Sequence, residues 1–158
     1  MINRTPKELT QLLDEEGLAI EDSVINSNEV IVLPSKGKML TTDDVWITRQ
    51  IRASKRKVHV PDYASTQIRD FRGGEWEHSL IIVAEAAKDV IIAVASAWIY
   101  KKIEDWKEKK KGNPNGLNAP PAFKLRYYFT KSKRYVEIEG DAESSLKALD
   151  SLKDEKDV

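Results

Sequence analysis

Residues 80–100, LIIVAEAAKDVIIAVASAWIY, form the most apolar stretch of the 158-residue sequence. The stretch is long enough to cross a bilayer as a helix. However, Glu85, Lys88 and Asp89 lie in its middle, where each charge would cost roughly 2.5–3.5 kcal/mol in a membrane. The few polar side chains occupy a narrow stripe, which is typical of a helix buried on most of its circumference. We therefore expect a buried helix and no membrane partner.

The predicted helix extends from about residue 76 to about residue 111, because the charged segment KKIEDWKEKKK keeps apolar residues at helical spacing. At 1.5 Å per residue the helix would span roughly 50 Å, whereas a compact domain of this length is only about 40 Å across. The helix is thus expected to bend or to project at its C-terminal end, and a protein interface is expected there through Ile99, Ile103 and Trp106. Alternatively, the segment 123–138 folds back over this stripe within one chain.

The segments around this helix predict an α+β fold, with one long central helix packed on a mostly antiparallel sheet and short helices at both termini. Thr5, Pro6 and Glu8 form a capping pattern for the first short helix, and Gly17 suits its end. Asp141 is expected to cap the last helix. Strands are predicted at residues 28–33, 57–60, 123–129 and 134–138, the last two as a hairpin with Phe123, Leu125, Tyr127 and Phe129 on one face.

Residues 41–53, TTDDVWITRQIRA, are ambiguous. Val45, Ile47 and Ile51 alternate as in a strand, whereas Thr42 followed by acidic residues suits the start of a helix. The β-branched and aromatic side chains favour a strand. Residues 57–60 would then pair with it across a turn.

The composition limits the chemistry and the location of the protein. The chain contains no cysteine, which excludes disulfides, thiolate catalysis and cysteine-bound metal. This fits a reducing compartment, and the first ten residues contain no apolar run of the kind found in secretory signals, so we expect a cytoplasmic protein. The length suits one domain over residues 1–152, followed by a frayed charged tail over residues 153–158.

Two basic segments, residues 49–59 and 124–135, suggest nucleic-acid binding. The net charge of the chain is zero, but residues 1–29 carry −5 and residues 30–59 carry +5. Cations that contact phosphate beside rings that stack on bases suit single-stranded nucleic acid or RNA. A solvated hairpin rim would explain the same residues. The expected contacts are Arg49, Arg52, Arg56, Lys57, Arg126, Tyr128, Lys131, Lys133 and Arg134.

Catalytic motifs are nearly absent from the sequence. It contains no G-x-x-x-x-G-K-[ST], G-x-G-x-x-G or G-x-S-x-G motif, and neither His59 nor His78 has partners at a metal-ligand spacing. Pro61-Asp62 followed by Glu75-Trp76-Glu77 resembles the P-D…(D/E)-x-K arrangement of many nucleases, with Glu77 in place of the lysine. A metal-dependent nuclease would require Glu8, Asp62 and Glu75 to converge. We expect no catalytic residue, no metal and no cofactor.

The leading hypothesis is therefore a non-enzymatic interaction protein whose partner is a second copy or another protein, with contact through the end of the long helix. Nucleic-acid binding is the alternative, and a metal-dependent nuclease ranks third. The placement of the two basic segments distinguishes the first two hypotheses. A single basic face with exposed tyrosines would favour nucleic acid.

Overall fold

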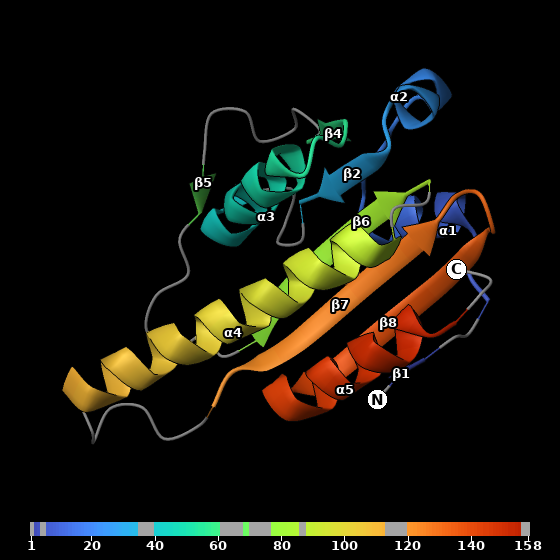
Figure 1. Cartoon of the computed structure of the whole chain (residues 1–158). Helices are drawn as coiled ribbons and strands as arrows, with labels where there is room; N and C mark the ends of the chain where they lie inside the picture. The colour runs from blue at the N-terminus through green and yellow to red at the C-terminus, as the bar shows by residue number, and fades with distance from the viewer. Residues whose placement is uncertain are drawn as a thin grey trace.

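The computed structural model describes residues 2–3, 6–34, 40–60, 68–69, 77–85, 88–112 and 120–155. These residues form a mixed sheet with helices on both faces (Figure 1). The elements follow in the order β1 (Ile2–Asn3), α1 (Leu9–Glu15), α2 (Asp22–Ser27), β2 (Val30–Leu33), β3 (Leu40–Thr41), α3 (Thr42–Ala53), β4 (Val58–His59), β5 (Ile68–Arg69), β6 (Glu77–Ala84), α4 (Lys88–Gly112), β7 (Ala122–Phe129), β8 (Arg134–Asp141) and α5 (Ala142–Lys153).

The strand order of the main sheet is β1-β8-β7-β6-β2-β4, and β3 pairs with β5 separately. The β1–β8, β7–β8 and β2–β6 pairs are antiparallel, whereas β6–β7 and β2–β4 are parallel. The predicted α+β class, with a long helix on a sheet and short helices near both ends, is confirmed. The sheet is mixed because α4 carries the chain back from the end of β6 to the start of β7.

The expected start of the long helix is wrong, because residues 77–84 form strand β6 and the helix begins at Lys88. Strand β6 lies between β7 and β2 and is buried on both faces. Leu80 and Ile82 contribute to one core, and Ile81 and Val83 to the other. A strand of this kind is apolar throughout, so hydrophobic periodicity does not distinguish it from a buried helix.

Residues 42–53 form a helix, so the strand expected there is wrong. The side chain of Thr41 accepts a hydrogen bond from the backbone N–H of Asp44, whose carboxylate accepts one from the N–H of Thr41. This capping box starts α3, and Ile47 and Ile51 then face the core one turn apart. Strand β4 consequently pairs in parallel with β2 and not in a hairpin with the preceding segment.

The other terminal elements match the expectations in part. Helix α1 begins at Leu9 with Glu8 as its N-cap, so the predicted capping pattern from Thr5 is wrong, whereas Gly17 does adopt a left-handed φ of 66°. Strands β7 and β8 form the expected hairpin. The carboxylate of Asp141 accepts a hydrogen bond from the N–H of Ser144 and caps α5. Of the tail, residues 153–155 are described, and residues 156–158 lie outside the described residues.

Two cores hold the sheet between layers of helices. Helices α3, α4 and α5 cover one face (Figure 1). On this face Trp98 packs edge-on against Phe123, with 5.3 Å between ring centroids. The four predicted apolar side chains of β7 all lie in this first core, as expected. Helix α1 covers the other face with Leu12 and Leu13 against Tyr128 and other residues.

Replacing Ile91 with aspartate should unfold the protein, because Ile91 is buried between α4 and the sheet. An unpaired buried charge typically costs about 3–5 kcal/mol, out of a total stability of about 5–15 kcal/mol. Ala93→Asp on the exposed side of the same helix is the matched control and should change stability by less than about 1 kcal/mol. Urea denaturation followed by circular dichroism measures both. Equal denaturation midpoints would show that α4 does not pack on the sheet.

Candidate functional site

The C-terminal end of α4 extends past the sheet. Strands β6 and β7 pair over eight residues, or about 26 Å, which a helix covers in about 18 residues. Helix α4 has 25 residues, and its end projects beyond the starts of β6 and β7 (Figure 1). The predicted projection of this helix end is therefore present, although the helix starts later than expected.

The three predicted interface residues lie in different environments. Ile99 is fully buried in the first core, so it is unable to contribute to an exposed surface. Ile103 and Trp106 are half-buried and lie on the projecting part. The amino group of Lys110 lies 4.9 Å from the centroid of the Trp106 ring, and the indole N–H has no hydrogen-bond partner among the described residues.

Tyr100 belongs to this surface and was missed from the sequence. Its side chain is 61% exposed, and no other large hydrophobic side chain among the described residues is classed as exposed. It precedes Ile103 by three residues, and Trp106 follows by three more, so Ile103 lies between the directions of the other two around the helix. Trp106 comes two turns after Ile99 and continues its buried stripe, whereas Tyr100 lies off that stripe, so the spacing of apolar residues did not indicate it.

Helices α3 and α4 meet at a half-buried polar cluster. Asp43 of α3 forms an ion pair with Lys102 of α4, and its carboxylate lies 3.5 Å from Nδ1 of His78 in β6. Burial by itself would raise the pKa of Asp43, but the hydrogen bonds from His78 and Lys102 lower it below its usual value. The His78 ring also contacts Trp98 and Phe123. This cluster joins three elements.

Two shallow hollows border the outer side of α3. One, of about 270 Å³, is lined by Asp44, Val45, Thr48, Arg49, Arg52 and Val60. The other, of about 300 Å³, is lined by Thr42, Asp43, Val45, Trp46, Arg49, Lys101 and Lys102. Val45 and Arg49 border both hollows, which therefore form one continuous surface between α3 and the middle of α4.

Asp44 carries the most perturbed carboxyl group of this region. Its Oδ2 accepts the N–H of Thr41, but its buried Oδ1 has no hydrogen-bond partner among the described residues. Burial raises the pKa of Asp44 to about 7, against the hydrogen bonds from Thr41, and the nearby charge of Asp43 raises it further. At neutral pH this carboxyl group is therefore close to half-protonated.

The two predicted basic segments lie on separate surfaces. Arg49 and Arg52 are exposed on α3, and Arg56 and Lys57 are exposed in the turn that leads to β4. Arg56 lies 3.8 Å from the carboxylate of Glu29.

In the second segment, Arg126 forms an ion pair with Glu16 beneath α1, and Arg134 lies 3.7 Å from Glu155. Tyr128 is only 6% exposed, so its ring is not free to stack on a base. Only Lys131 and Lys133 in the β7–β8 turn keep exposed cations.

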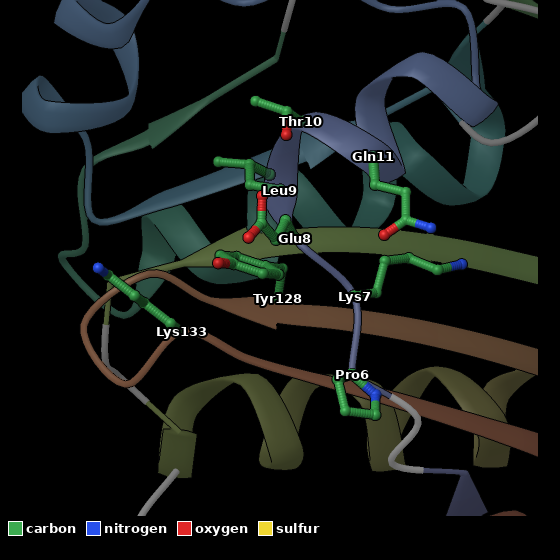
Figure 2. A pocket seen from close by; sticks show the side chains of 8 residues that line it. All are labelled: Pro6, Lys7, Glu8, Leu9, Thr10, Gln11, Tyr128 and Lys133. Atoms are coloured by element: carbon green, nitrogen blue, oxygen red, sulfur yellow. The ribbon is translucent and has the colours of Figure 1, made fainter.

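A further hollow, of about 570 Å³, lies where α1 begins (Figure 2). Tyr128 lies between Lys133 on one side and Lys7 on the other, close to Glu8 and Leu9 (Figure 2). The amino group of Lys7 lies 2.8 Å from Glu15 and covers the ring of Tyr135, so it is already engaged. The remaining charges, Glu8 and Lys133, have opposite signs. This hollow therefore favours neither anions nor cations.

Metal and membrane sites were also searched within the described residues. No group of three or more histidine, aspartate or glutamate side chains there is placed to hold a metal ion. Asp62 and Glu75 of the nuclease-like pattern lie outside the described residues, and Glu8 lies at the start of α1. Among the described helices, none combines the length and the apolar character that a bilayer span needs.

Comparison with known proteins gives no further information. No family model matches the chain, and no curated protein or solved structure shows significant similarity to it.

Replacing Asp44 with asparagine should remove a pH dependence of stability. The pKa of Asp44 rises from 3.8 to about 7 on folding, so the folded state binds this proton more tightly. The resulting stabilisation is complete below the unfolded pKa and is lost as the pH rises through 7. At about 1.4 kcal/mol per pKa unit, the wild type should lose up to about 4 kcal/mol between pH 4 and pH 8 relative to Asp44→Asn. Urea denaturation at several pH values measures this difference.

Asp141→Asn is the control of opposite sign. The hydrogen bond from the backbone of Ser144 lowers the pKa of Asp141, so its contribution is present above the unfolded pKa and disappears as the pH falls through the folded value. The wild type and Asp141→Asn should therefore converge in acid, whereas the wild type and Asp44→Asn should diverge as the pH rises. A constant difference between the wild type and Asp44→Asn would show that Asp44 titrates normally.

Proposed function

We propose that this protein is a non-enzymatic interaction module that self-associates through the projecting end of α4, residues 103–112. The observation that supports this proposal is the excess length of α4 over the strands it connects. A crossover helix needs no more than the length of its strands, and the additional turns add little to the core of their own chain. The cysteine-free composition fits a cytoplasmic location, which we propose with it.

Apolar side chains on the projecting end favour a protein partner. Tyr100, Ile103 and Trp106 follow one another at intervals of three residues, and an aromatic residue of this kind commonly contributes 2 kcal/mol or more when it is buried in an interface. These features together favour a packed contact over a solvated helix end.

The charge order along this segment favours a second copy in antiparallel orientation. Glu104 and Asp105 come first, and Lys109, Lys110 and Lys111 follow. If two copies pair around a two-fold axis near residue 107, the acidic residues of each lie opposite the lysines of the other. A parallel pair would place like charges together.

Ion pairs within one chain at this helix end do not prevent the antiparallel pairing of two copies. They join Lys101 to Asp105, Lys107 to Glu104 and Lys111 to Glu108, all on exposed side chains. Exposed pairs of this spacing contribute only about 0.3–0.5 kcal/mol each, so they are replaced readily by contacts between chains. Because the contact is small, we expect a weak dimer whose population depends on concentration.

Single cysteines provide a direct test, since the chain has no cysteine of its own. Lys107→Cys lies near the proposed two-fold axis, and Glu108→Cys points about 100° away from it around the helix. Both side chains are exposed, so neither change should disturb folding. Under mild oxidation Lys107→Cys should form disulfide-linked dimers at least tenfold faster than Glu108→Cys. Electrophoresis without reducing agent measures both rates.

Adding Trp106→Ala to the Lys107→Cys variant should slow its cross-linking toward the rate of Glu108→Cys. Sedimentation velocity of the wild type over a wide concentration range provides an independent readout. Equal cross-linking rates at both positions, or a wild-type monomer at every concentration, would contradict self-association through this helix end.

A further inference from the structure

Arg49 and Arg52 place two guanidinium groups on the outer side of α3. Both side chains are exposed on α3, and neither forms a hydrogen bond or an ion pair with another described residue. The arginines of the other basic regions differ, because Arg56, Arg126 and Arg134 all lie beside a carboxylate. Arg49 and Arg52 are three residues apart, so they lie on the same side of the helix. This side of α3 therefore presents two cations that no described residue neutralises.

Helix α4 adds further positive charge to the same surface. Lys101 and Lys102 of α4 line the same hollow as Arg49 of α3. Lys102 is neutralised by Asp43, which His78 also contacts, and Lys101 lies 3.2 Å from the exposed carboxylate of Asp105. Asp43 is thus engaged with α4 and β6, whereas Arg49 and Arg52 have no carboxylate partner among the described residues.

The surface also contains a recessed aromatic ring and an unused acceptor. Trp46 is half-buried and lines the hollow with Arg49 and Lys101. Asp44 lines the neighbouring hollow between Arg49 and Arg52, and its buried Oδ1 has no donor among the described residues. Free guanidinium groups, an indole and a carboxyl oxygen correspond to the three parts of a nucleotide: the phosphate, the flat base and the N–H groups of its edge.

From this arrangement we propose that the α3–α4 surface, made of Asp44, Trp46, Arg49, Arg52 and Lys101, binds single-stranded nucleic acid. Arg49 and Arg52 contact phosphates, and Trp46 stacks on an unpaired base. A duplex is unsuitable, because its bases are already stacked and the ring is recessed between two helices. An acidic protein segment suits the arginines, but its aliphatic carboxylate side chains offer no flat ring to stack on the indole.

Two double charge reversals test the site against general electrostatic attraction. Arg49→Glu/Arg52→Glu removes the proposed contacts, and Lys131→Glu/Lys133→Glu reverses two exposed cations of the β7–β8 turn. Both variants lower the net charge by the same amount. Binding of fluorescein-labelled oligouridylate and oligothymidylate is measured by fluorescence anisotropy over a series of salt concentrations. Circular dichroism of both variants confirms the fold.

The arginine variant should lose at least tenfold in affinity at low salt, whereas the lysine variant should stay within about twofold of the wild type. Loss of two phosphate contacts should also reduce the slope of log affinity against log salt by about 1.4, at about 0.7 per phosphate on a single strand. Trp46→Leu should weaken binding with an unchanged salt slope, since stacking releases no counterions. If the glutamates disturb folding, Arg49→Gln/Arg52→Gln replaces them and should show the same order of effects.

Three results would overturn the proposal. The first is no binding of either oligonucleotide by the wild type at low salt. The second is an equal loss of affinity in both double variants, which would indicate general attraction to the whole charged surface. The third is competition by polyglutamate at equal or lower concentration than oligouridylate, which would assign the surface to an acidic protein partner. The cross-linking assay on residues 107 and 108 is independent of all three.

Discussion

The parallel pairing of β6 with β7 is the constraint on which the rest of the structure depends. Two parallel neighbours require a connection that returns along the full length of the strands, and a helix on one face of the sheet is the usual solution. Helix α4 fills this role and covers the first core. Because β6 lies inside the sheet, its other face also needs a cover, which α1 and the segment after it provide. One strand pair thus accounts for helices on both faces.

The charge blocks of the sequence serve mainly to join distant parts of the chain. The acidic N-terminal block supplies Glu16 to Arg126 of β7 and Glu29 to Arg56 beside β4. The acidic C-terminal block supplies Glu155 to Arg134 at the start of β8. These contacts explain why a chain of zero net charge has strongly charged segments. They also show why Arg49 and Arg52 stand apart, because no block supplies a carboxylate to them among the described residues.

The sequence predicted correctly those helices and strands whose residue pattern fits only one type of secondary structure. The alternation in residues 123–129 defined both the strand and its buried face, and Asp141 marked the start of α5. The apolar run of residues 80–84 has two meanings, since a strand buried on both sides and a buried helix share it. Its assignment depends on pairing with β7 and β2, which are distant in sequence. The segment 41–53 had signals for both a strand and a helix and was predicted as a strand, whereas the buried contacts of Ile47 and Ile51 decide it as a helix.

The candidate sites were harder to predict, because exposure depends on the tertiary fold. The sequence places Tyr128 among several cations, and it was therefore predicted to be exposed beside them. Helix α1 covers Tyr128, and the aromatic ring that lies beside Arg49 is instead that of Trp46. Lys101 approaches α3 only because α4 crosses the sheet beside it, and residues this far apart in the sequence give no local signal. Tyr100 likewise became visible only when the buried side of α4 was known.

The edges of the main sheet have a consequence for the behaviour of concentrated protein. The outermost strands, β1 and β4, are each two residues long. A short edge strand offers a neighbouring chain few unpaired backbone groups of its own, although β1 covers only Glu137 and Ile138 of the longer strand β8. The long apolar strand β6, which would be prone to fibril formation if it were exposed, has partners on both sides. Fibrils should therefore form only after the sheet itself has opened.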